Sequence, residues 1–149
     1  MTLSTRCLGV FAAVATTVGL TAAPAAAEPY AQLGGVQVVG APYCTGIATP
    51  EAMVTPLQEG DRVESGVRVA VYFTPDRDVA CAVTMTTTWT NLDTGASGTG
   101  DITVTSDGQP ASQRHYGFAG YSRAEFWTGP GTVVVTVSTH PDDELEVTV

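Results

Sequence analysis

Apolar and polar residues alternate with a period of two through most of the chain after residue 28. The longest run covers 79–90, and a second run covers 67–73. Because successive side chains of a β-strand point to opposite faces of the sheet, both runs are predicted to be strands. Residues 74–78 lie between them and contain Pro75 and two Asp residues, which suit a tight turn. We therefore expect the two runs to form a hairpin, with Cys81 facing the core.

The same pattern predicts shorter strands along the rest of the chain. Only 49–53, which contains Pro50, suggests a single helical turn. Many short strands with frequent turn residues predict an all-β protein. We expect an antiparallel, immunoglobulin-like β-sandwich of about 7–9 strands with one disulfide, and a small closed β-barrel is the alternative. The further predicted strands lie at 36–39, 43–48, 97–105, 114–119, 123–128, 132–139 and 145–149.

Residues 1–27 have the composition of a secretory signal peptide. Arg6 and the amino terminus supply a positive start, 7–22 is apolar, and 25–27 is a run of Ala suited to cleavage. We expect cleavage before Glu28 to leave one domain, residues 28–149, in the extracellular space or the cell envelope. After cleavage we expect no stable membrane association. An uncleaved membrane anchor is the alternative.

Cleavage would remove Cys7 and leave Cys44 and Cys81. Two cysteines in an exported chain are expected to form a disulfide. The residues are 37 positions apart, and closing a loop of that length contributes about 4 kcal/mol in the chain-entropy model.

The charge of the chain excludes some classes of partner. It has 15 acidic and six basic residues, with a net charge of −9. Loss of Arg6 with the signal peptide would make this −10. Without clustered cations, binding to nucleic acid or to anionic membranes is not expected. All six basic residues are Arg, which suggests a GC-rich bacterial genome.

Residues 140–144, His-Pro-Asp-Asp-Glu, resemble the signature of the zinc-dependent N-acetylglucosaminyl deacetylases. The resemblance covers these five residues and implies that His140 and Asp143 bind zinc while Asp142 acts as the base of a hydrolase. That family carries the motif near the start of a larger α/β domain, with another His ligand downstream. Here the other histidine of the mature chain, His115, lies upstream. We therefore favour an acidic turn without metal or cofactor, and a deacetylase-like zinc hydrolase is the alternative.

Two other arrangements are incomplete. Residues 120–124 approach the G-x-S-x-G nucleophile elbow but lack its last Gly. Acidic residues and Ser alternate with Gly over 93–101 and could offer oxygen atoms to Ca²⁺, but their order is not that of an EF-hand loop. We therefore expect a protein that is not an enzyme.

Aromatic residues cluster between 116 and 127. Alternation places residues 126 and 127 on opposite faces of a strand. If Phe126 faces the core, Trp127 can join Tyr121 or Tyr72 in a platform for a sugar ring or for an apolar patch of a partner. The plainer alternative is that Trp127 shields the end of a sheet. The cluster consists of Tyr116, Phe118, Tyr121, Phe126 and Trp127.

These features together predict a small exported, non-catalytic protein. We expect a binding or structural module of the cell envelope or extracellular space, with an envelope polysaccharide or a protein as its partner. The composition also resembles that of the secreted apoproteins that carry enediynes, although those have two disulfides. A protease inhibitor with an exposed loop is a further alternative.

Overall fold

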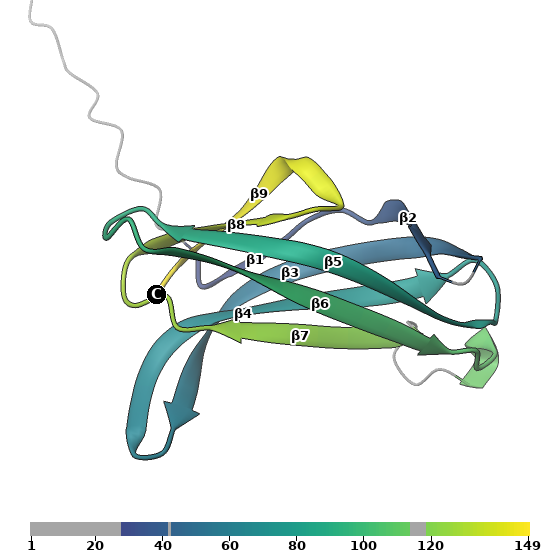
Figure 1. Cartoon of the computed structure of the whole chain (residues 1–149), viewed down its shortest axis with the longest axis horizontal. Helices are drawn as coiled ribbons and strands as arrows, with labels where there is room; N and C mark the ends of the chain where they lie inside the picture. The colour runs from purple at the N-terminus through teal and green to yellow at the C-terminus, as the bar shows by residue number, and fades with distance from the viewer. Residues whose placement is uncertain (1–27, 42, 114–118) are drawn as a thin grey trace, which may run out of the picture.

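A computed structural model describes residues 28–41, 43–113 and 119–149. The expected signal peptide lies outside the described residues, and so does 114–118, which holds Tyr116, Phe118 and most of one predicted strand. Within the described ranges the chain forms two antiparallel sheets that pack face to face (Figure 1). The predicted all-β sandwich is therefore confirmed.

The first sheet, here the five-stranded sheet, has the order β1-β3-β4-β7, and β2 also pairs with β3. The second, the four-stranded sheet, has the order β6-β5-β8-β9. A short 3₁₀ turn, η1 (Ala111–Gln113), follows β6. The strands are β1 (Tyr30–Gln32), β2 (Val36–Gly40), β3 (Cys44–Glu59), β4 (Arg62–Pro75), β5 (Ala80–Asn91), β6 (Ser97–Asp107), β7 (Gly120–Phe126), β8 (Thr132–Val137) and β9 (His140–Thr148).

The hydrophobic core lies between the two sheets. It is built from the faces that the alternation predicts, because every second residue of β5, and of β4 from Val67 onward, points inward and loses its contact with water. On β5, Trp89 lies 6.4 Å from Phe126 of β7 between ring centroids. Fully buried core side chains include Val67, Val69, Val71, Phe73, Met85, Ile102, Val104, Val133, Val135 and Val147.

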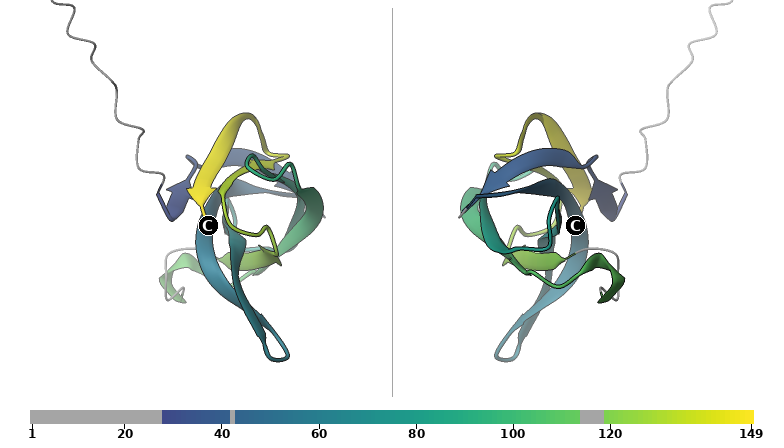
Figure 2. Two further views of the ribbon diagram at one scale, coloured as in Figure 1. Left: turned by 90° about the vertical axis from the view of Figure 1, so that its left-hand side faces the viewer. Right: turned by 90° about the vertical axis from the view of Figure 1, so that its right-hand side faces the viewer.

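The two sheets also lie close together where β6 runs beside β7. A Cβ atom on Gly120 would lie 2.5 Å from the carbonyl oxygen of Thr105, and one on Gly100 would lie 2.9 Å from the ring of Phe126. Glycine at both positions permits this approach. Figure 2 shows the sheets curving around a common core. Among the described residues a single isolated bridge, between Ala41 after β2 and Ala82 of β5, connects the two sheets, with hydrogen bonds of 2.9 Å in both directions. No pair of strands joins them, so the structure is a sandwich and not the closed barrel.

The predicted hairpin of β4 with β5 is wrong. β4 pairs with β3 on one side and with β7 on the other, and β5 lies in the opposite sheet. Residues 74–78 carry the chain from one sheet to the other. Two strands that face each other across a core show the same alternation as two strands in a hairpin, so the pattern alone does not separate the two arrangements.

The helical turn suggested at 49–53 is also wrong, because this segment lies inside β3. β3 exchanges partners here: β2 pairs with 44–48 and β1 with 51–53. Pro50 lies at the junction, and its carbonyl oxygen accepts a hydrogen bond from Leu33 N at 3.1 Å. Proline has no N–H to donate. Because no residue of β1 or β2 pairs with position 50, the strand loses no ladder hydrogen bond there.

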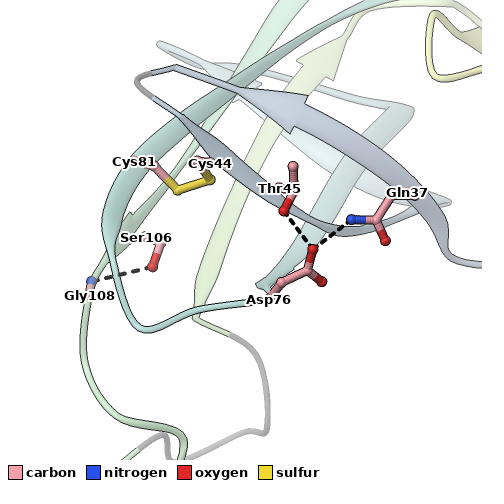
Figure 3. The surroundings of a disulfide bond; sticks show 7 residues. All are labelled: Gln37, Cys44, Thr45, Asp76, Cys81, Ser106 and Gly108. Atoms are coloured by element: carbon pink, nitrogen blue, oxygen red, sulfur yellow. Dashed lines mark hydrogen bonds between the residues drawn. A yellow bond between two sulfur atoms is a disulfide. The ribbon is translucent and has the colours of Figure 1, made fainter.

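The disulfide joins the two sheets (Figure 3). Cys44 of β3 and Cys81 of β5 are bonded, with their Cα atoms 5.9 Å apart. Near it, Asp76 in the crossover accepts hydrogen bonds from Thr45 Oγ1 at 2.6 Å and Gln37 Nε2 at 2.8 Å. These bonds, that from Thr45 first, lower the pKa of Asp76. The crossover is thus held to β2 and β3 beside the covalent bond.

Candidate functional site

Two of the three predicted platform residues lie together on the outer face of the five-stranded sheet. Tyr72 and Tyr121 are direct cross-strand partners in the pairing of β4 with β7. Their ring centroids are 5.2 Å apart, and the rings are tilted by 45°. Tyr121 is 42% exposed and Tyr72 is partly buried. The pair has the spacing of an interacting aromatic pair with one accessible ring.

A carboxylate and a third tyrosine complete this group, and neither was predicted. Glu51 of β3 is only 7% exposed, although it lies on the outer face. Its Oε1 accepts a hydrogen bond from Tyr72 at 2.9 Å, and its Oε2 accepts one from Tyr30 at 3.0 Å. We call Tyr30, Glu51, Tyr72 and Tyr121 the tyrosine cluster. Recognising 49–53 as a strand would have placed Glu51 on this face.

Two phenols of the tyrosine cluster, those of Tyr72 and Tyr30, are held in the protonated form. Burial, followed by the hydrogen bond to Glu51, raises the pKa of Tyr72 to about 12. The same two causes raise the pKa of Tyr30. Both hydroxyls therefore act as donors over the whole neutral range, and together they hold the carboxylate of Glu51.

The charges beside the tyrosine cluster are paired with one another. Arg68 of β4 forms an ion pair of 3.0 Å with Glu125 of β7. Arg123, two residues after Tyr121, lies 3.5 Å from the same carboxylate. Ion pairs this exposed contribute little to stability. They leave this face with nearly balanced charge, unlike the strongly acidic chain as a whole.

The structure places Trp127, the third predicted residue, in a different contact. It follows the end of β7, and the guanidinium carbon of Arg62 lies 4.9 Å from the centre of its ring. Six residues of extended chain separate it from Tyr121, a distance of about 20 Å. Phe126 packs against the core, as its predicted inward position requires. Trp127 thus lies against the β3–β4 hairpin, which projects beyond the sandwich (Figure 1).

His140 is buried and engaged in hydrogen bonds. It is 3% exposed and begins β9, after a turn at 138–139. Its Nε2 lies 2.8 Å from the carbonyl oxygen of Gly34, and its Nδ1 lies 2.9 Å from Thr139 Oγ1. A carbonyl only accepts, so Nε2 carries the proton and Nδ1 accepts from the hydroxyl.

The expected acidic turn is thus the first part of an edge strand. Asp142 and Asp143 are exposed on β9. The described part of the chain contains no group of three His, Cys, Asp or Glu side chains placed to hold a metal ion. His115 lies outside the described residues.

Comparison with known protein families, curated proteins and solved structures finds no match to this chain. In the described ranges no helix has the length and apolar character needed to cross a membrane.

Proposed function

We propose that the mature chain is an exported, non-catalytic module that binds a neutral polysaccharide of the cell envelope or extracellular space through the tyrosine cluster. The observation that carries the proposal is the 5.2 Å pair of Tyr72 and Tyr121, held beside Glu51 and Tyr30 on an outer sheet face.

Export is supported by the composition of residues 1–27 and by the disulfide. A pair such as Cys44–Cys81 persists in oxidising compartments and is rare in the cytosol. The charge of the mature chain suits an exported surface that does not attach to anionic lipid.

An immunoglobulin-like topology is supported by the order of the strands. β3-β4-β7 faces β6-β5-β8-β9, and the chain crosses between the sheets after β4, β6 and β7. Sandwiches of this class have such crossings, and antibody domains carry a buried Trp on the first strand after the first crossing, where Trp89 of β5 lies. Here the disulfide joins β3 to β5, whereas antibody domains join their second and sixth strands.

A neutral sugar is the ligand that suits this surface. Tyr121 and Tyr30 each expose 42% of their surface, and an exposed ring offers an apolar face to a sugar's C–H groups while its hydroxyl can donate or accept. Gln32, an exposed residue opposite Glu51 in the β1–β3 pairing, adds an amide. The paired charges nearby give no reason to favour an ionic ligand.

The test is binding of the mature protein to cell envelopes and to insoluble polysaccharides. Tyr121→Ala removes the most accessible ring of the pair, and we expect roughly tenfold weaker binding, the upper range for such a ring. Tyr43→Asn is the matched control. Tyr43 is fully exposed and lies just before β3, about 25 Å of extended chain from Glu51. Its φ of 50° is a conformation that Asn tolerates. Equal binding by wild type and Tyr121→Ala, or equal loss in both variants, would overturn the proposal.

A further inference from the structure

The outer face of the four-stranded sheet has a concavity of its own. It has a volume of about 350 Å³ and lies over β5 and β8, beside β9, which rises in an arch beside β8 (Figure 1). The arch arises because the β8–β9 register shifts between Val135 and Val137, so that Pro141–Glu144 has no partners in β8. The volume is within the range of small-ligand sites.

Two rows of side chains line this concavity. Thr90, Val134 and Glu146 form one row across β5, β8 and β9. Thr88 and Thr136 form the next row, and Glu144 lies beside them on the arch. Hydroxyls and methyls therefore form the floor, and two carboxylates form one wall.

The threonine hydroxyls inside the concavity differ from those outside it. Outside, Thr84 bonds to Thr103 at 2.8 Å and Thr86 donates to Asp101 at 2.8 Å. Within the part of the chain that the structure describes, the side chains of the concavity, Thr88, Thr90, Thr136, Glu144 and Glu146, have no hydrogen-bond or ion-pair partner. The concavity thus holds hydroxyl and carboxylate groups open to a ligand.

Charge determines the kind of ligand. The strands of the four-stranded sheet contain no Lys or Arg, and their one histidine, His140, is buried, whereas β4 and β7 of the other sheet contain three arginines. The negative charge of this face is therefore not balanced locally. The acidic residues of its strands are Asp101, Asp107, Asp142, Asp143, Glu144 and Glu146.

We propose that this concavity binds a linear polyamine, a chain of ammonium groups joined by short alkyl spacers. Ammonium groups only donate, and the threonine hydroxyls and two carboxylates accept. Glu144 and Glu146 are alternate residues of β9, about 7 Å apart in extended chain, so they can receive two ammonium groups of one ligand. The spacers lie against Val134, Leu92 and the threonine methyls.

The residues that line the concavity also favour a polyamine over amino sugars and metal ions. The concavity contains no aromatic ring for an amino sugar to stack on. No group of three carboxylate or imidazole ligands for a metal ion occurs in the described ranges. The site is on the opposite sheet from the tyrosine cluster and does not depend on the proposed function.

Calorimetric and NMR titration of the mature protein with spermidine at physiological ionic strength tests this proposal. Screening over about 8 Å suppresses diffuse attraction under these conditions. We expect saturable binding, with amide shifts concentrated at Thr88, Thr90, Val134 and Thr136. Glu144→Gln together with Glu146→Gln should weaken binding by about tenfold or more, because charge-assisted hydrogen bonds are lost.

The control removes the same charge elsewhere. Glu59→Gln with Asp61→Asn, at the exposed tip of the β3–β4 hairpin, should change the Kd by no more than about twofold. Thr136→Val, which removes one hydroxyl with little change of shape, should weaken binding without changing the net charge. Equal loss in both charge variants, no saturation, or tighter binding of a glucosamine oligomer or an oligolysine peptide would overturn the assignment of a polyamine.

Discussion

The hydroxyl of Tyr72 donates a hydrogen bond of 2.9 Å to Oε1 of Glu51. The two residues lie on neighbouring strands and are 21 positions apart in the sequence. The bond lies on the outside of the sheet, where a carboxylate would ordinarily be hydrated. Glu51 is instead 7% exposed. The outer face of the five-stranded sheet thus contains a buried carboxylate that accepts hydrogen bonds from two tyrosines.

Tyr72 is expected to ionise only at strongly alkaline pH. Its pKa is about 12 because of burial and then the bond to Glu51. The folded pKa lies above the unfolded value of about 10. The stability that this group contributes is therefore fully present below pH 10 and is lost as the pH rises toward 12. Glu51→Gln removes the charge and should lower this pKa. Phenolate absorbance measures the pKa, and urea denaturation at pH 9 to 12 measures the stability. An unchanged titration step near pH 12 in the variant would contradict the assigned cause.

Removal of the disulfide should destabilise the sandwich strongly. The bond closes a loop of 37 residues and links the two sheets. Cys44→Ala with Cys81→Ala should lower the free energy of unfolding by about 4 kcal/mol. Urea denaturation of the variant and of wild type measures this difference. Reductant should destabilise wild type and leave the variant unchanged, and a loss below about 1 kcal/mol would show that the bridge is not a main source of stability.

His140 should behave as a structural residue and not as a metal ligand. His140→Ala leaves the carbonyl of Gly34 without its donor at 2.8 Å, and we expect a loss of about 1–3 kcal/mol for the hydrogen bond, with some added cost for the cavity. Thermal unfolding with and without added zinc measures it. Stabilisation of wild type, but not of the variant, by stoichiometric zinc would instead support the deacetylase-like alternative.

Asn91 at the end of β5 should be one of the most sensitive polar positions. It is fully buried, and its Nδ2 donates to Thr128 O at 2.9 Å and to Pro130 O at 3.0 Å. Its Oδ1 accepts from Asp93 N at 3.0 Å and Thr94 N at 3.1 Å.

Asn91→Ala would leave several of these groups unsatisfied, so we expect a loss of about 3 kcal/mol or more in chemical denaturation. Thr94→Ala is the matched control. It removes only an exposed contact of 3.3 Å to Ala96 N, and a similar loss in both variants would refute the role given to Asn91.

Where the sequence predictions succeeded, the signal was local. The strands predicted at 36–39, 79–90 and 97–105 correspond closely to β2, β5 and β6, since alternation is a property of neighbouring residues. The prediction failed at 49–53, where Pro50 resembles the first residue of a helix. A strand accepts proline at this position because the gap between β1 and β2 leaves no partner that needs its N–H. Tyr30 and Glu51 went unnoticed for a similar reason, since each contacts its partners only through strand pairing.

The sequence by itself determined the class of the fold, the inward faces of its strands and the pairing of Cys44 with Cys81. The alternation of apolar and polar residues and the number of cysteines can be read from the order of residues alone. Neither requires knowledge of contacts between distant residues. The tertiary structure decided which strands share a sheet, that His140 binds Gly34, and that Tyr72 joins Tyr121 and Glu51 while Trp127 meets Arg62. These contacts join residues far apart in the chain, and only the packing of the two sheets brings them together.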